Sequence, residues 1–236
     1  MTSEAFDGAM EVLESQPDRL EGYYEAFLSV FPVGGAAVST VGEVLGSETL
    51  AASDALAARL DELQFDLGEG PCWDAMRAAQ PVLVPEIRSG ASARWPAFAE
   101  SAVRDGVASL FAFPLGVGPV RFGAVDLYSV HPVHLSGAQA RQAGALAQVV
   151  SRHVLRRALN AIGAEEGEAV TAFSRRIVHQ ASGVVLAQLD LSADDARLVI
   201  QGQAFATSRP MMEVAQDIID GRLRFVRDGS RIEVAE

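Results

Sequence analysis

The last third of the chain predicts three short helices whose start and stop signals are in place. Ser192 stands before two acidic residues, Asp194 and Asp195, which is the pattern of a capped helix N-terminus. Pro210 suits the first turn of the next helix, and Gly221 suits its end. Apolar residues recur at helical spacing between these signals. This stretch is therefore expected to fold as a small helical bundle.

The first 135 residues instead mix strand and helix patterns. The two clearest strands, 109–115 and 121–130, are separated by a turn of glycine and proline, which predicts a hairpin. Shorter apolar runs predict strands at 36–41, 49–53 and 82–84, and helical spacing predicts helices at 4–31, 56–65, 71–79 and 95–105. The expected fold class is α+β.

A long helix is expected to connect the two parts. Ser136 and Gln139 match a capping box, and the helix that they start extends to about Ala161. Its apolar seam suits either a coiled-coil dimer or packing on the sheet, and comprises Ala143, Ala147, Val150 and Val154. Two glycines around a pair of glutamates then predict a hinge at 159–168. The expected division is a first domain at 1–158, the hinge, a helical domain at 169–226 and a C-terminal tail at 227–236.

The formal net charge is −12, and no lysine occurs, so every cationic side chain except histidine is an arginine. Residues 1–170 hold 22 acidic residues and 11 arginines, whereas residues 171–236 hold 9 and 8. A polyanion is repelled by the chain as a whole, but the acidic excess lies in the first two-thirds and the tail is almost neutral. No apolar run reaches the ~20 residues that span a bilayer, and the acidic N-terminus does not match a secretory signal. We therefore expect a cytoplasmic protein without a membrane partner.

Motifs of catalysis and metal binding are not evident. A nucleophile elbow, a phosphate-binding glycine loop and a zinc-binding helix pair are all missing, so we expect no enzyme and no cofactor. His131 and His134 lie close together, but Pro132 separates them and no carboxylate or thiol is near in sequence, so no metal is expected. Cys72 is the only cysteine, which excludes an intrachain disulfide.

Residues 30–155 resemble a GAF domain. The resemblance rests on GEGPCWDAMRAAQPVLVP at 68–85, ARWPAFAESAVRDGVASLFAFPL at 93–115 and RFGAVDLYS at 121–129. It implies an antiparallel sheet flanked by helices, a small-molecule ligand in some members, and a homodimer formed through the flanking helices. Two residues are candidates for ligand binding. Cys72 is either a reactive thiol near a helix start or a small buried residue, and Asp126 lines a pocket or lies on a solvated sheet face.

The tail, at roughly 170–225, resembles an ANTAR domain, the three-helix RNA-binding module of transcription antitermination regulators. The matching residues are Gln180, Ala181, Gly183, Leu186, Leu189, the run 191–196, Ala204, Val214, Ala215 and Ile218. The family commonly has basic residues where this chain has Ser182, Gln201 and Gly202. The resemblance implies RNA hairpins as the partner, and the low charge predicts that the domain binds weakly or needs two copies.

The candidate RNA-binding residues are Arg175, Arg176, His179, Ser182, Arg197, Gln201 and Arg209. Arg175 and His179 lie one turn apart and either contact phosphate or form a solvated helix face. Phe173 and Phe205 are expected in the core, so no stacking platform is expected. The leading hypothesis is a signal-responsive, dimeric antitermination regulator that binds structured RNA. The alternative is a sensory or protein-interaction dimer whose tail has lost RNA binding.

Overall fold

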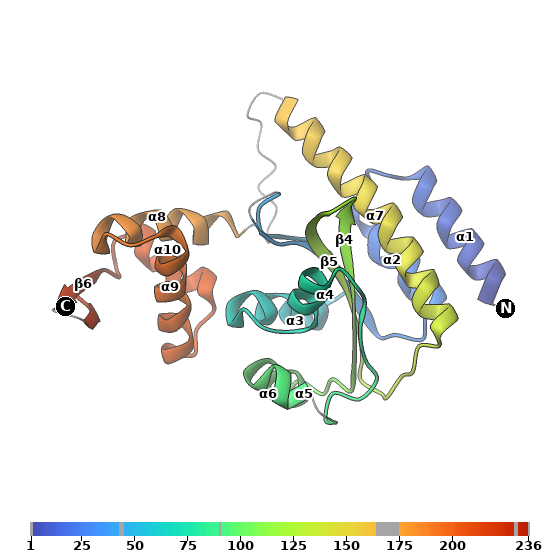
Figure 1. Ribbon diagram of the computed structural model, residues 1–236, viewed down its shortest axis with the longest axis horizontal. Coiled ribbons are helices and arrows are strands. Elements are labelled where there is room, and N and C mark those ends of the chain that lie inside the picture. The colour runs from blue at the N-terminus through green and yellow to red at the C-terminus, as the bar shows by residue number, and fades with distance from the viewer. Residues whose placement is uncertain (1, 43–44, 90, 164–174, 229–230, 236) are drawn as a thin grey trace. The chain divides into compact units, whose positions relative to one another are not determined.

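The computed structural model describes residues 2–42, 45–89, 91–163, 175–228 and 231–235. The chain divides into two compact units, residues 1–173 and residues 174–236, and each is described by itself. Figure 1 shows a unit built on a sheet and a unit of short helices, which confirms the expected α+β fold class.

Five antiparallel strands form the sheet of the first unit, in the order β2-β1-β5-β4-β3. The strands are β1 (Gly35–Thr40), β2 (Glu48–Ala52), β3 (Val82–Val84), β4 (Ser109–Val117) and β5 (Val120–Ser129). β4 and β5 pair from Ser109 opposite Ser129 to Val117 opposite Val120, which confirms the predicted hairpin. All six residues of β1 are buried, because helices cover both faces of the sheet.

One face of the sheet is covered by α2 (Leu20–Val30) and α7 (Gly137–Gly163), and α1 (Thr2–Ser15) packs on these two helices (Figure 1). Phe27 and Phe113 are fully buried in this layer, and each such burial contributes about 1.5–3 kcal/mol. The α7 seam that begins at Ala143 lies in the same core, so it packs within its own unit. The hydrogen bonds between Ser136 and Gln139 confirm the capping box, at 2.9 and 3.2 Å.

The opposite face carries α3 (Ala55–Leu67), α4 (Pro71–Ala78), α5 (Ala91–Arg94) and α6 (Pro96–Arg104). The Asp54 carboxylate caps α3 by accepting hydrogen bonds from the backbone N–H groups of Leu56 and Ala57, both at 2.9 Å. Gly68 ends α3 with φ at +65°, a conformation that favours glycine. Pro71 then starts α4 in its first turn, as predicted.

The second unit contains α8 (Arg176–Leu189), α9 (Ala193–Thr207), α10 (Met211–Ile219) and a hairpin of β6 (Phe225–Asp228) and β7 (Arg231–Val234). The three predicted helices are therefore confirmed. Their shared core comprises Val178, Ala181, Val185, Leu189, Ala196, Ile200, Ala204, Met211, Val214, Ala215 and Ile218. The Ser192 hydroxyl accepts a hydrogen bond from the backbone N–H of Asp195 at 3.1 Å, so the predicted cap is present.

The structure adds to the expected boundaries in three places. The helix expected at 4–31 is two helices, because Pro17 cannot donate a backbone hydrogen bond and disfavours helical backbone before it. The tail expected at 227–236 contains most of the β6–β7 hairpin. α7 continues to Gly163, so the first part of the expected hinge is helical, while 164–168 lie outside the described residues. Among the helices that the structure describes, none is long and apolar enough to cross a membrane.

Candidate functional site

A basic surface, here called the basic face, is formed on α8 and α9 by Arg176, His179, Arg197 and Gln201. Arg176 and His179 are exposed and lie three residues apart on α8. Partial burial lowers the pKa of His179, and the positive charge of Arg197 on α9 lowers it further, so the two side chains are neighbours. Gln201 is half-buried one turn beyond Arg197. The permanent charges of the basic face are therefore Arg176 and Arg197.

Two predicted RNA-binding residues do not present their side chains on this surface. Arg175 precedes α8 and is only 3% exposed. Ser182 is 6% exposed, and its hydroxyl donates a hydrogen bond to the carbonyl oxygen of Val178 at 2.8 Å. Ser182 lies on the side of α8 that faces the packed interior, with Val178, Ala181 and Val185. That Arg175 and Ser182 contact RNA stays a prediction, and such a contact would require their buried side chains to become accessible.

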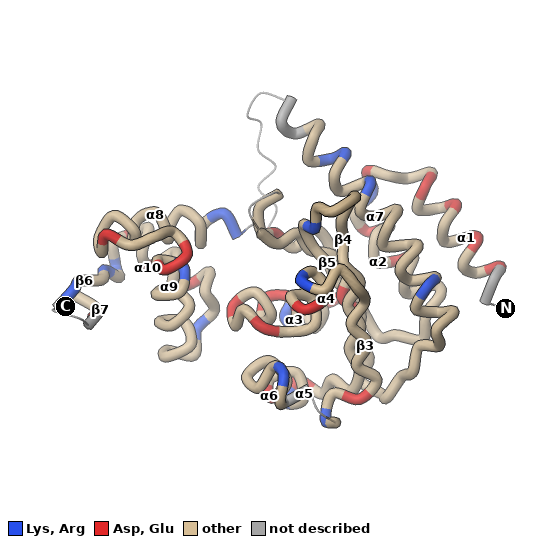
Figure 2. The backbone as a smooth tube through the Cα atoms, viewed as in Figure 1, with Lys and Arg blue, Asp and Glu red and all other residues tan. Residues whose placement is uncertain are grey.

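Arg209 is exposed, but acidic residues of α10 surround it. Its guanidinium contacts the carboxylate of Glu213 at 3.3 Å and that of Asp217 at 2.7 Å. Arg209 first and then Arg222 lower the pKa of Asp217, since both donate hydrogen bonds to its carboxylate. Figure 2 shows the acidic residues of α10 in red. The charge of Arg209 is thus largely compensated within the unit.

The outward side of α9 is apolar. Phe205 is 68% exposed and Leu198 is 55% exposed. The expectation that Phe205 belongs to the core was therefore wrong, because the buried side of α9 is set by Ala196, Ile200 and Ala204. Phe173 lies outside the described residues.

A buried polar cluster lies between β5 and α3 of the first unit. Asp126 is 7% exposed, and its Oδ2 atom accepts a hydrogen bond from Nε2 of Gln64 at 3.1 Å. Burial raises the pKa of Asp126 well above its ordinary value, and the negative charge of Asp61 raises it further. Within the described ranges, Oδ1 of Asp126 and the hydroxyl of Ser39 are buried without a hydrogen-bond partner. Asp126 is therefore an interior group and not part of a solvated sheet face.

Cys72 adjoins the same cluster from α4. Its backbone N–H donates to Oε1 of Gln64 at 2.8 Å, and the residue is 2% exposed. This burial beneath α4 fits the interpretation of Cys72 as a small buried residue, because a buried thiol does not reach a second chain. The backbone carbonyl of Gln64 also accepts a 2.6 Å hydrogen bond from the indole of Trp73. Gln64 thus links α3, α4 and β5.

The histidines differ from one another. His153 was expected at the surface or an interface, but it is 8% exposed and its ring lies 6.1 Å from that of Tyr23. Burial lowers the pKa of His153, and Arg156 lowers it further.

In the part of the chain that the structure describes, no three His, Cys, Asp or Glu residues group as metal ligands would.

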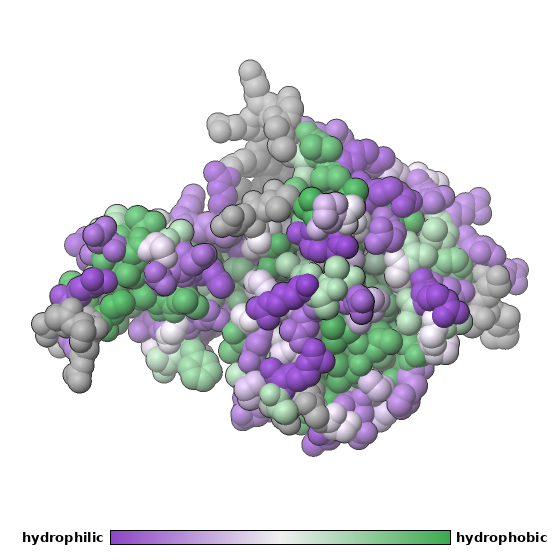
Figure 3. Space-filling model, in the orientation of Figure 1, coloured by the Kyte–Doolittle hydropathy of each residue, from purple (hydrophilic) through white to green (hydrophobic). Residues whose placement is uncertain are grey.

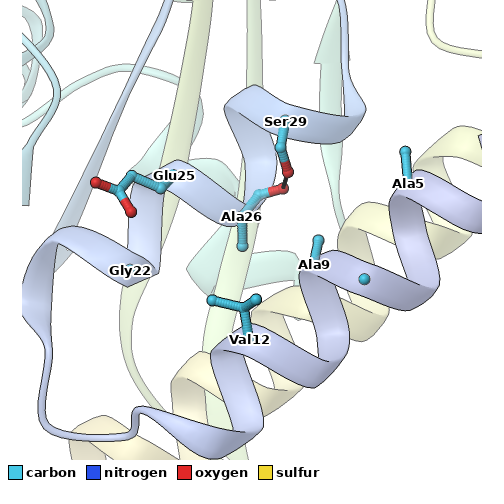
Figure 4. A pocket seen from close by; sticks show the side chains of 8 residues that line it. Ala5, Ala9, Val12, Gly22, Glu25, Ala26 and Ser29 are labelled. Carbon is cyan, nitrogen blue, oxygen red and sulfur yellow. Dashed lines mark hydrogen bonds between the residues drawn. The ribbon is translucent and has the colours of Figure 1, made fainter.

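An apolar groove runs along the outer side of α1 and α2. Its volume is about 390 Å³, and Figure 4 shows Ala9 and Val12 of α1 beside Ala26 of α2. The wall contains two glycines, Gly8 and Gly22, where an added Cβ would meet no atom within 4 Å. Val12 is 49% exposed. The groove is therefore a shallow apolar surface on the two N-terminal helices.

Comparison with known protein families finds a match to the ANTAR domain over residues 171–219. This range includes α8, α9 and α10. The chain carries an ANTAR domain. No curated protein matches the sequence.

Comparison with solved structures concerns the sheet-containing unit. The GAF domain of a phosphoenolpyruvate-protein phosphotransferase from Coxiella burnetii is 12% identical, with a TM-score of 0.52 over 67% of this chain and 95% of that one. The corresponding Acinetobacter domain is 12% identical, with a TM-score of 0.51 over 69% and 99%. A free methionine-R-sulfoxide reductase from Neisseria meningitidis is 15% identical, with a TM-score of 0.47 over 67% and 90%. At this identity the first two matches establish the fold, so the ANTAR domain follows a unit with the GAF fold.

Sequence reasoning identified residues of each surface but not their exposure or their neighbours. It found the arginines of the ANTAR domain, but it could not separate the exposed Arg176 and the partly buried Arg197 from Arg209, which pairs with two carboxylates. It also did not identify Gln64 and Asp61 as neighbours of Asp126. A signal for Gln64 exists in the sequence, because a polar residue lies among the apolar positions of α3.

Proposed function

We propose that this chain is a signal-responsive antitermination regulator that binds structured RNA through its ANTAR domain. The observation that carries the proposal is the ANTAR match at 171–219 together with the basic face of α8 and α9. Arg176 and Arg197 supply guanidinium groups, which bind phosphate oxygens in a bidentate manner. Gln201 adds a side-chain amide that can hydrogen-bond to a base or to the backbone.

RNA binding through so few cations is weak for a single copy. Phosphate contacts supply most of the affinity, and the helical unit has almost no net charge. A homodimer would present two basic faces, and the second contact would then benefit from a high effective concentration. We place the dimer contact on the flanking helices α1 and α2, whose outer groove is apolar.

In this proposal the GAF-fold unit receives the signal. Its buried cluster contains hydrogen-bonding atoms of Asp126 and Ser39 that lack partners within the described part of the chain, and a small polar ligand could satisfy them. The unit would act without catalysis, in the cytoplasm, and α7 would connect it to the ANTAR domain.

The experiment is a salt titration of hairpin-RNA binding with the full chain. Wild-type affinity should fall steeply with salt, because binding releases counterions. The double substitution Arg176→Ala and Arg197→Ala should weaken binding and lower the salt slope by about 1 per arginine for each copy bound. Arg224→Ala with Arg227→Ala is the matched control, since it removes the same charge from exposed positions outside the basic face.

A second candidate function is a sensory or protein-interaction dimer that no longer binds RNA. The compensation of Arg209 by Glu213 and Asp217 favours it, together with the burial of Ser182, where the family commonly has a basic residue. Absence of hairpin binding even at low salt would support this candidate. Equal loss of affinity in the basic-face and control variants would also argue against a defined RNA site.

A further inference from the structure

The buried polar cluster of the first unit contains oxygen atoms without partners. Within the described ranges, neither Oδ1 of Asp126 nor the hydroxyl of Ser39 has a hydrogen-bond partner. Asp126 is 7% exposed and Ser39 is 0% exposed, so bulk water does not replace the missing bonds. Buried polar atoms are rarely left unsatisfied, because they have given up water for nothing. The two atoms therefore indicate that a further group binds in this cluster.

Both atoms belong to the side of the sheet that α3 covers. Ala37 of β1 is directly opposite Asp126 of β5, and Ser39 follows two residues later, so the three side chains project from the same side. Ser39 is also opposite Thr49 of β2, whose hydroxyl donates a hydrogen bond to the carboxylate of Asp61 on α3. The side chains of Ser39 and Asp126 thus point into the layer between the sheet and α3.

This layer contains two carboxyl groups. Figure 3 shows hydrophilic residues on the surface over α3, as is ordinary for the exposed side of a helix, but its buried side carries Asp61 and Gln64 as well. Asp61 is close enough to Asp126 for its negative charge to raise the pKa of Asp126. Gln64 donates one hydrogen bond to Asp126, and within the described residues no arginine or histidine forms an ion pair with Asp126.

The chemistry of the cluster selects a cation. A carboxylate only accepts hydrogen bonds, and the Gln64 amide already donates to Asp126 while its oxygen accepts from the backbone N–H of Cys72. An anion would add like charge beside two carboxyl groups, and a neutral ligand would leave the charge of Asp126 uncompensated in the interior. A small cation compensates this charge and is attracted by the hydroxyl oxygen of Ser39. Oxygen atoms suit hard metal ions and ammonium groups.

Protonation of Asp126 is the alternative way to remove the buried charge. Burial raises the pKa of Asp126 and so favours its neutral form when no cation is bound. A proton on this carboxyl group, however, does not provide the hydroxyl of Ser39 with a partner. A cation between the two side chains accounts for both atoms.

We propose that the buried cluster of Asp126, Asp61 and Ser39 binds a small cation, either a hard metal ion or a primary ammonium group. The cation would join β5, α3 and β1, so its binding would fasten α3 to the sheet. Its role as the signal rests on the proposed function, in which the GAF-fold unit receives the signal. Binding itself is measured without RNA.

The test is thermal unfolding of the full chain after removal of bound metal with a chelator. Tryptophan fluorescence follows the first unit alone, because both tryptophans of the chain, Trp73 and Trp95, belong to it. Tetramethylammonium chloride supplies the ionic strength, since its bulky cation cannot donate a hydrogen bond. The probes are sodium, magnesium, calcium and methylammonium chlorides. At least one should raise the wild-type midpoint by roughly 5 °C at saturation, and the salt that does so tells a metal ion from an amine.

Three variants test whether the shift arises in this cluster. Asp126→Asn keeps the shape of the side chain without its charge, so its midpoint should not respond to the salts. Ser39→Ala keeps both carboxyl groups and should weaken cation affinity roughly tenfold. Glu11→Gln, an exposed change of equal charge, is the matched control and should respond like the wild type. No shift with any of the four salts, or equal shifts in the wild type and Asp126→Asn, would overturn the proposal.

Hairpin-RNA binding, measured on the same samples, separates this result from the proposed function. A chain that binds RNA but shows no cation-dependent shift lacks the cation site and keeps the regulator function. A chain that shows the shift but ignores RNA keeps the cation site and contradicts the regulator function.

Discussion

Asp126 illustrates how burial decides the chemistry of one side chain. Its carboxyl group lies beneath α3 with one hydrogen bond from Gln64, and Asp61 is close enough to affect its pKa. Burial disfavours the charged form, and a second carboxylate disfavours it further. The alternation of residues along β5 indicates on which face of the sheet Asp126 lies. The helix that covers this face, α3, is distant in sequence. Its burial could therefore not be predicted from the strand alone.

Asp126→Asn should make the GAF-fold unit more stable at pH 7–8 than the wild type. The pKa of Asp126 is raised in the folded state, whereas an unfolded Asp titrates near ~3.9. Between these values the folded state binds more protons, so the wild type loses stability as pH rises. The asparagine variant lacks this loss, and its advantage should shrink toward pH 4. Thermal unfolding across this pH range measures the effect, with Glu11→Gln, an exposed change of equal charge, as the control.

Ser182→Arg restores the residue type that ANTAR domains commonly have there, yet it should lower the folding stability of this chain. Ser182 is 6% exposed and bonds to the backbone of its own helix, so a buried arginine would cost roughly 2–4 kcal/mol. The neighbouring Gly183→Arg should be tolerated, because that position is open. Chemical denaturation followed by circular dichroism compares the two. A stable Ser182→Arg variant with tighter RNA binding would contradict the placement of Ser182.

At the scale of elements, the features that were predicted correctly are encoded locally. The caps at Ser136 and Ser192 depend on residues within one helical turn, and the β4–β5 hairpin depends on a turn between two apolar runs. The features that were not predicted are those where one sequence pattern opposes another or where the pattern is weak. Pro17 interrupts a spacing that otherwise continues through 4–31, and the β6–β7 hairpin is too short to show strong alternation. Phe205 was misplaced because composition suggests burial while helix geometry directs it outward.

Ser192→Ala should destabilise the ANTAR domain by about 1 kcal/mol, because the backbone N–H of Asp195 loses its acceptor. Ser192→Gly should cost only a few tenths of a kcal/mol, since glycine adopts the cap conformation readily. Urea unfolding monitored at the helical signal distinguishes the two variants. Equal stability of all three chains would mean that the cap does not hold α9.

At the scale of the whole molecule, charge is distributed unevenly between the units. The first 170 residues carry twice as many acidic residues as arginines, whereas the tail is almost balanced. The acidic excess of the first unit disfavours nucleic acid, and in the proposed function the basic face on α8 and α9 is the surface of the described residues that would contact RNA. If the proposed function holds, such a molecule gains affinity mainly by presenting two basic faces together.

Val12→Glu should convert the proposed dimer to a monomer and weaken hairpin-RNA binding. Val12 is 49% exposed in the α1–α2 groove, and a carboxylate there would be buried without a partner on association. Loss of the second copy removes the effective concentration that supports bivalent binding, so the affinity for a two-hairpin RNA should fall roughly 10²-fold or more. Affinity for a single hairpin should change little. Leu159→Glu, at a 59% exposed position of α7 outside the groove, is the control. Light scattering gives the oligomeric state, and an unchanged dimer in Val12→Glu would exclude the groove as the contact.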